Sequence, residues 1–93
     1  MLYVINYWYF AYMETVLYKN IVSNPDVCNG KPTFKGTRIT VKTIMEFLFA
    51  GDSEQEVLEG YPRITKEDLQ TAKEFTMMIL EKPITIQQLK AVG

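Results

Sequence analysis

The sequence contains no histidine and only one cysteine, Cys28. Histidine is the commonest general base and metal ligand in proteins, and one thiolate cannot build a zinc site. The other residues offer no combination of nucleophile, base and orienting group. We therefore expect a protein that is not an enzyme and holds no cofactor and no metal, although a Mg²⁺ site made only of carboxylates is chemically possible.

A long hydrophobic run is also missing. The most apolar stretch, residues 1–13, is shorter than the roughly 20 residues that a membrane-spanning helix needs. It lacks the basic start and the cleavage site of a secretory signal, and a lone cysteine is typical of a reducing compartment. We expect a soluble, cytoplasmic protein.

Aromatic residues crowd the same stretch, and they include Tyr7, Trp8 and Phe10. This composition favours an extended strand, and exposed aromatic side chains are common at protein interfaces. Residues 1–13 are therefore interpreted as a partner-binding extension. The alternative is a leader that precedes a natural start at Met13. Residues 14–93 are expected to form a single domain, small enough for a homodimer to be favoured.

Charge is distributed unevenly in a chain whose net charge is -1. Residues 30–43 carry four cations and no acid: Lys31, Lys35, Arg38 and Lys42. The charged residues of 44–60 are all acids: Glu46, Asp52, Glu54, Glu56 and Glu59. The basic stretch is a candidate for phosphate contacts, unless Arg38 pairs with a carboxylate of the acidic stretch. The acidic stretch either faces a basic partner or is a solvated surface.

Residues 14–39 have the composition of short strands and turns. The segment TVLYKNIVS is consistent with one strand, and Asn29-Gly30 is a strong turn signal. Gly36 is expected to take a positive φ in a tight reversal, and the segment TRITV would then be the returning strand. These features predict a compact β-hairpin region.

Residues 40–81 are predicted to form three helices. Thr40 can cap the first helix, and Gly51 can end it in a left-handed conformation. Ser53 and Glu56 form a capping box for a short second helix, and Thr65 can cap the third, which Pro83 ends. The inner face of the third helix is expected to hold Leu69, Ala72, Phe75, Thr76, Ile79 and Leu80. The predicted fold is α+β, mainly α: a short β-hairpin region before a three-helix core of helix-turn-helix or winged-helix type.

Further basic and polar residues lie just before the third helix and on its outer face, where a DNA-reading helix would present them. With the four cations of residues 30–43, they complete the candidate DNA-binding set: Arg63, Lys66, Gln70, Thr71 and Lys73. The outer face of this helix also carries Glu67, Asp68 and Glu74, which would bring negative charge close to phosphate. The last residues, ITIQQLK, are a second candidate for protein contacts through Ile84, Ile86 and Leu89.

The stretches NPDVCNGKPTFKGTRITV and IMEFLFAGDSEQEVLEGYPRITKEDLQTA resemble the bacterial and archaeal domain-of-unknown-function-433 family over about residues 21–80. The resemblance rests on G-K-P, G-T-R-I and Y-P in this order. It implies a homeodomain-like or winged-helix-like trihelical core. It also implies an antitoxin of VapB type, which would neutralise a PIN-like ribonuclease toxin and bind its own promoter.

Two functional hypotheses follow. The leading hypothesis is an antitoxin-like regulator that binds a partner protein, and in its fuller form also double-stranded promoter DNA. The alternative is a protein-interaction module that never touches DNA, which the mixed charge of the third helix favours.

Overall fold

The computed structural model describes residues 13–81. Three short strands come first, β1 (Thr15–Tyr18), β2 (Ile21–Ser23) and β3 (Thr33–Phe34), with a turn of 3₁₀ helix, η1 (Cys28–Gly30), before β3. Three helices follow, α2 (Val41–Phe49), α3 (Glu54–Gly60) and α4 (Lys66–Glu81). The strands form one antiparallel sheet in the order β1-β2-β3. The predicted mainly α fold with a short β region is confirmed.

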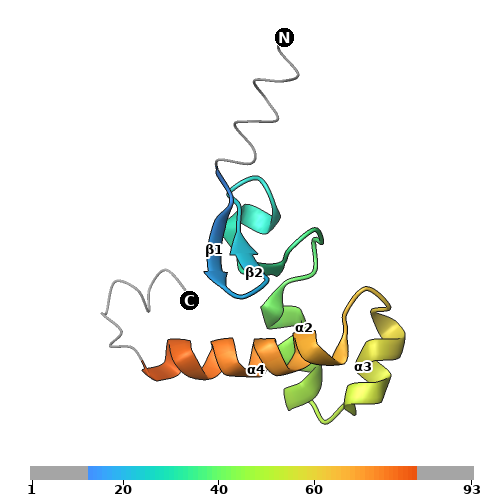
Figure 1. Ribbon diagram of the computed structural model, residues 1–93. Coiled ribbons are helices and arrows are strands. Elements are labelled where there is room, and N and C mark those ends of the chain that lie inside the picture. The colour runs from blue at the N-terminus through green and yellow to red at the C-terminus, as the bar shows by residue number, and fades with distance from the viewer. Residues whose placement is uncertain (1–12, 82–93) are drawn as a thin grey trace.

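The sheet lies on one side of α4, and the tip of the β1–β2 hairpin points at this helix (Figure 1). One hydrophobic core joins the sheet to the helices, because buried residues from β2, β3, α2, α3 and α4 pack together. Its members are Ile21, Phe34, Val41, Ile44, Met45, Val57, Ile64, Leu69, Ala72 and Phe75. No helix within residues 13–81 is both long and apolar enough to cross a membrane.

All three predicted helix starts are confirmed. The Thr40 hydroxyl accepts a hydrogen bond from the backbone N–H of Thr43 at 3.1 Å. Ser53 caps α3 through a complete capping box with Glu56. The Thr65 hydroxyl accepts from the N–H of Asp68 at 3.1 Å, which fixes the first turn of α4.

The strands differ from the prediction in two places. TVLYKNIVS is two strands rather than one, because the chain reverses at Lys19, whose φ is 48°. The predicted returning strand TRITV is also wrong. The Thr37 hydroxyl donates to the Phe34 carbonyl and accepts from the Ile39 N–H, so this segment closes a turn, and only an isolated bridge joins Thr33 to Thr40.

The inner face of α4 is only partly as predicted. Leu69, Ala72 and Phe75 are buried, but Ile79 is 42% exposed and Leu80 is 64% exposed. Packing ends near Phe75 because the last turns of α4 extend past α2 (Figure 1). This uncovered end of α4 bears directly on the candidate site.

Candidate functional site

An apolar groove lies between α2 and the C-terminal half of α4. From α2, Val41, Met45 and Phe49 line it at a spacing of four residues, which places them on one face of the helix. From α4, the lining residues are Phe75, Thr76, Ile79 and Leu80. This first hollow has a volume of about 320 Å³. A second hollow of about 540 Å³ continues it, shares Met45, Phe49, Thr76 and Leu80, and adds Met77. We call the two hollows together the apolar groove.

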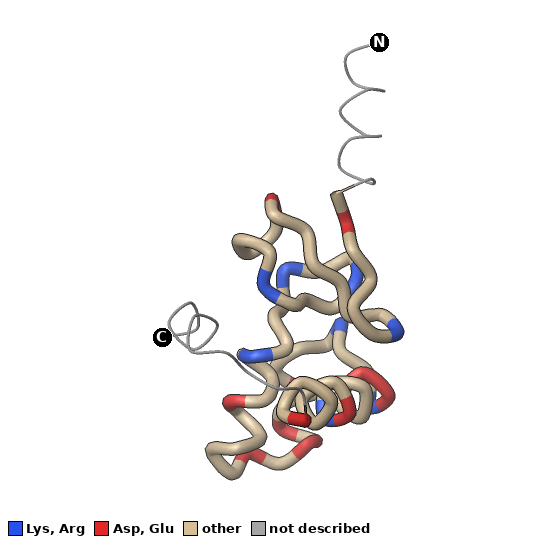
Figure 2. The backbone as a smooth tube through the Cα atoms, turned by 90° about the vertical axis from the view of Figure 1, so that its left-hand side faces the viewer, with Lys and Arg blue, Asp and Glu red and all other residues tan. Residues whose placement is uncertain are grey.

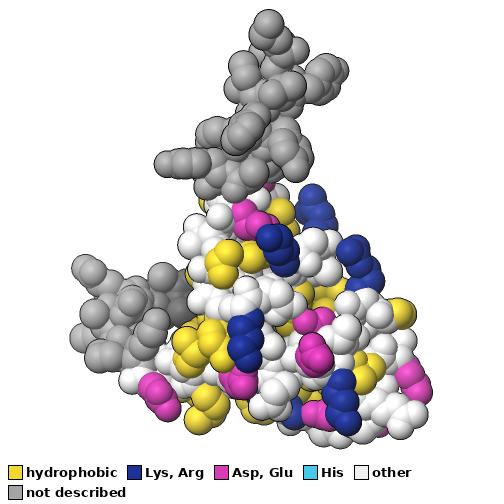
Figure 3. Space-filling view, in the orientation of Figure 1, with side chains coloured by type: hydrophobic (Ala, Val, Ile, Leu, Met, Phe, Trp, Pro, Cys, Tyr) yellow, Lys and Arg dark blue, Asp and Glu magenta, His cyan; other side chains and the backbone are white. Residues whose placement is uncertain are grey.

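The groove combines a buried floor with exposed apolar edges. Val41, Met45 and Phe75 are at most 8% exposed and belong to the core. Phe49 at the end of α2 is 76% exposed, and Met77 on α4 is 59% exposed. Figure 3 shows yellow side chains at the surface around the C-terminal turns of α4. Soluble domains rarely leave such large apolar side chains together in water unless the surface binds something.

Among residues 13–81, the charged side chains that line this groove are Lys42, Glu46 and Lys73, and we call them its rim. Lys42 and Glu46 lie one turn apart on α2, with Nζ and Oε1 3.6 Å apart. Lys73 borders the second hollow and pairs with Glu54 of α3 at 2.5 Å. The hydrogen bond from Lys73 lowers the pKa of the Glu54 carboxyl. An apolar segment could therefore lie in the groove without burying an unpaired charge.

A different, polar hollow lies at the sheet. Arg38, which follows β3, and Arg63, which precedes α4, both line it, together with Asn24 and Glu14. Lysines and arginines are concentrated in this half of the domain, whereas acids dominate around α3 and α4 (Figure 2). The volume of this sheet hollow is about 430 Å³, and it shares no lining residue with the apolar groove.

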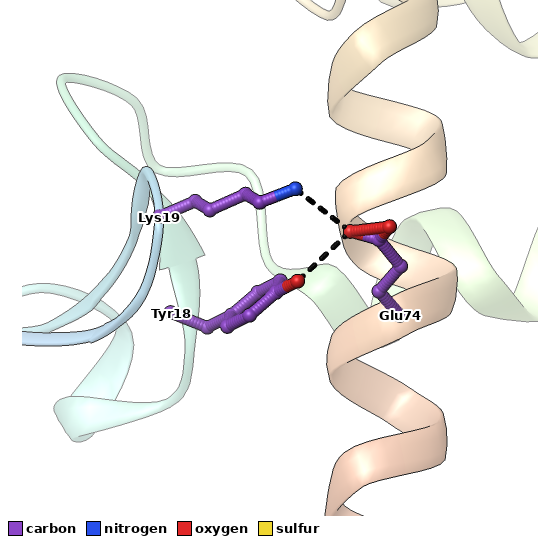
Figure 4. Close-up of polar contacts among 3 residues, drawn as sticks. All are labelled: Tyr18, Lys19 and Glu74. Carbon is purple, nitrogen blue, oxygen red and sulfur yellow. Dashed lines mark hydrogen bonds and ion pairs between the residues drawn. The ribbon is translucent and has the colours of Figure 1, made fainter.

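The β1–β2 hairpin is tied to α4 through Glu74. The Tyr18 hydroxyl and the Lys19 ammonium both donate to Glu74 Oε1 at 2.9 Å (Figure 4). The hydrogen bond from Lys19, followed by that from Tyr18, lowers the pKa of the Glu74 carboxyl. The same contact raises the pKa of the Lys19 amine. Asn20 adds a hydrogen bond of 2.6 Å to Asp68 Oδ1, so two carboxylates of α4 hold the hairpin.

The family of this chain follows from residues 21–76, which match the family model described as "Protein of unknown function (DUF433)". The chain belongs to the DUF433 family. The "Uncharacterized protein y4eO" of Sinorhizobium fredii (strain NBRC 101917 / NGR234) is 33% identical over 52 residues. The match covers 56% of this DUF433 chain but only 24% of that protein. No solved structure matches the chain significantly.

The structure brings together only some of the predicted DNA-binding residues of this DUF433 chain. Arg38 and Arg63 share the sheet hollow, whereas Lys42 lines the apolar groove. Thr71 is 7% exposed, so its prediction as an outward-facing residue is wrong. Lys31, Lys35, Lys66 and Gln70 are exposed, and Lys73 is half-buried.

Two further predictions concern partners of these residues. The ion pair between Arg38 and the acidic stretch is not formed, because Arg38 makes no salt bridge within residues 13–81. The predicted partner-binding residues of the two chain ends lie outside the described residues: Tyr7, Trp8, Phe10, Ile84, Ile86 and Leu89.

The apolar groove itself was missed by the sequence patterns. Ile79 and Leu80 repeat at core spacing and were assigned to the interior. One signal pointed to the groove. α2 has nine residues and α4 has 16, so the longer helix must present apolar residues that the shorter one cannot reach.

Proposed function

We propose that this chain is a protein-binding module, and that the apolar groove holds an amphipathic helix of a partner protein. One observation carries the proposal. Phe49, Met77 and Leu80 are each more than half exposed around a floor of buried core residues. Burying apolar surface is the main driving force of protein association, and large apolar side chains on a concave surface are suited to anchor it.

A helix is the occupant that matches the shape and the charge of the groove. Two helices form its walls, and a third helix can pack against both with its apolar stripe facing the floor. The rim offers both signs of charge, because Lys42 and Glu46 are side by side on α2. Charged residues that flank the apolar stripe of a partner helix would therefore meet complementary charge.

The antitoxin role implied by the family resemblance gives the proposal its specific form, in which the partner is a PIN-like ribonuclease toxin. The acidic stretch supports this form, since Glu46, Glu56 and Glu59 are exposed on α2 and α3. A ribonuclease has a basic surface for its substrate, and carboxylates next to an apolar anchor suit such a surface.

Binding of the chain's own promoter DNA is the second candidate function. The basic residues around the sheet favour it, but α4 is poorly prepared to read base edges. Asp68 and Glu74 of α4 bond to the hairpin, and Lys73 bonds to Glu54. We therefore propose that any DNA contact is made to backbone phosphates and is independent of sequence.

The test is co-expression of the tagged chain with the protein encoded beside its gene, followed by affinity purification. We expect the two proteins to purify together from the wild type. The Phe49→Glu variant should lose the partner, because the bound partner helix would bury the new carboxylate. The matched control is Val16→Glu, which places the same charge on β1 at a side chain that is 62% exposed. Loss of the partner in the control but not in the groove variant would refute the proposal.

A further inference from the structure

Two arginines from separate loops line the sheet hollow. Arg38 lies in the turn after β3, and Arg63 lies in the connection between α3 and α4. The Arg63 guanidinium lies against Gly36, since a Cβ built on that glycine would be 4.0 Å from Nη2. Gly36 has a φ of 78°, which suits glycine, so the chain can turn tightly beneath the arginine. The fold thus places two guanidinium-bearing loops around one hollow.

Neither arginine is neutralised by an acid of the described chain. Four lysines, Lys19, Lys35, Lys42 and Lys73, form salt bridges within residues 13–81, whereas Arg38 and Arg63 form none there. Glu14 lines the same hollow, but its carboxylate lies 3.9 Å from the Lys35 ammonium. The two guanidinium groups therefore give the hollow an excess of positive charge.

Asn24 adds a neutral donor to the hollow. The residue is almost buried, at 8% exposure, and it lines the hollow. Its Oδ1 accepts the backbone N–H of Asp26 at 2.9 Å, which fixes the orientation of the amide. Its Nδ2 group makes no hydrogen bond within residues 13–81, and it reaches solvent, because no buried side-chain nitrogen of the described residues lacks a partner. These N–H groups face water in the free protein and are available to an acceptor on a ligand.

We propose that the sheet hollow binds a phosphate group through Arg38, Arg63 and Asn24. Arginine presents a fork of N–H donors that matches the oxygens of phosphate, and two forks from different loops can engage different oxygens of one group. The hollow is open to solvent, so the phosphate can belong to a larger molecule, either a nucleic-acid backbone or a free nucleotide. The site is separate from the apolar groove, so the proposal does not depend on partner binding there, and only its nucleic-acid form rests on the second candidate function.

Glu14 gives the proposal a prediction of the opposite sign. Its carboxylate lowers the affinity of the hollow for an anion, because like charges repel at short range. Glu14→Gln should therefore tighten phosphate binding by roughly threefold, whereas removal of the arginines should weaken it. Nonspecific attraction to a basic surface would depend on overall charge and not on these particular residues.

The experiment follows the Arg Nε–H and Asn Nδ2–H₂ signals of the ¹⁵N-labelled protein by NMR. Sodium phosphate is titrated against sodium chloride of equal ionic strength, and a fluorescent 12-base-pair duplex of arbitrary sequence is followed by anisotropy. We expect phosphate to shift the signals of Arg38, Arg63 and Asn24. Arg38→Ala with Arg63→Ala should weaken binding at least about tenfold, because charge-assisted hydrogen bonds are lost.

Two further variants serve as controls. Arg38→Lys keeps the charge and loses the fork, so it should bind more weakly than the wild type while remaining folded. Lys42→Ala removes one cation that does not line the sheet hollow, so the phosphate-induced NMR shifts should stay unchanged. Duplex binding much tighter than that of phosphate identifies nucleic acid as the source, and equal affinities identify a free phosphate or nucleotide. Absence of phosphate-specific shifts, or an Asn24 shift of unchanged size in the double arginine variant, would overturn the proposal.

Discussion

Two leucines of α4 allow a direct test of where the core ends. Leu69→Ala and Leu80→Ala remove the same atoms from the same helix, but Leu69 is 0% exposed and Leu80 is 64% exposed. Helix propensity changes equally in both variants, because alanine replaces leucine within α4 each time. The difference between their free energies of unfolding therefore reports how strongly each leucine is covered by other residues.

The expected costs differ by several-fold. Removing a fully buried leucine side chain destabilises a protein by about 2–5 kcal/mol, because apolar contacts are lost and a cavity is left. Leu80 has about a third of its surface covered, and a third of the roughly 1.5–3 kcal/mol for full burial is about 0.5–1 kcal/mol. Urea unfolding followed by circular dichroism at 222 nm measures both values.

The result that refutes this reasoning is equal destabilisation by the two variants. It would mean that the C-terminal half of α4 is covered in solution and is not a free groove. A second copy of the chain would be the first occupant to test, because stability would then rise with protein concentration. A concentration series of the wild type therefore accompanies the comparison.

Three further predictions concern local structure and pH. Ser53→Ala should cost about 1 kcal/mol of stability in urea unfolding, because the Ser53 hydroxyl accepts the Glu56 N–H at 3.1 Å. Gly51→Ala should cost about 1 kcal/mol by the same measurement, since φ is 102° at this C-terminal cap. The hydrogen bond from Lys19 lowers the folded-state pKa of Glu74. The stability that this hydrogen bond contributes is therefore present above pH 4.5, the ordinary pKa of the carboxyl, and is lost as pH falls through the lowered pKa. Glu74→Gln should remove this part of the acid dependence in melting curves between pH 6 and pH 2, and an unchanged dependence would contradict the assignment.

Helix boundaries could be predicted from sequence because their causes are local. Thr40, Ser53 and Thr65 each bond to a backbone N–H three residues later, so the capping residue and its target are visible together in the sequence. Gly36 and Gly51 were likewise predicted from turn and cap chemistry, and both have a positive φ.

The strands were harder to predict because each is too short to show a pattern. β3 has two residues and β2 has three, so alternation of inward and outward side chains has no room to appear. The reversal at Lys19 was missed because lysine is not a typical turn residue. Its position is fixed instead by contacts with α4, which lie far away in the sequence.

The two candidate surfaces depend on distances that periodicity does not contain. Helical spacing correctly put Leu80 on the same face as Leu69, but burial requires another element to reach that part of α4. Arg38 and Arg63 line one hollow only because the loop after β3 lies beside the connection that leads into α4. The approach of these two loops leaves no trace in a single sequence, whereas the greater length of α4 was a signal for the groove.

The central claim is that the apolar groove binds a partner protein, and methyl NMR tests it most directly. The chain, labelled at methionine, isoleucine and leucine methyl groups, is titrated with the protein encoded beside its gene. We expect the largest shifts at Met45, Met77 and Leu80, while the methyl groups of Ile21 and Leu17 in the sheet stay in place. Shifts concentrated in the sheet, with the groove methyl groups unchanged, would contradict the account.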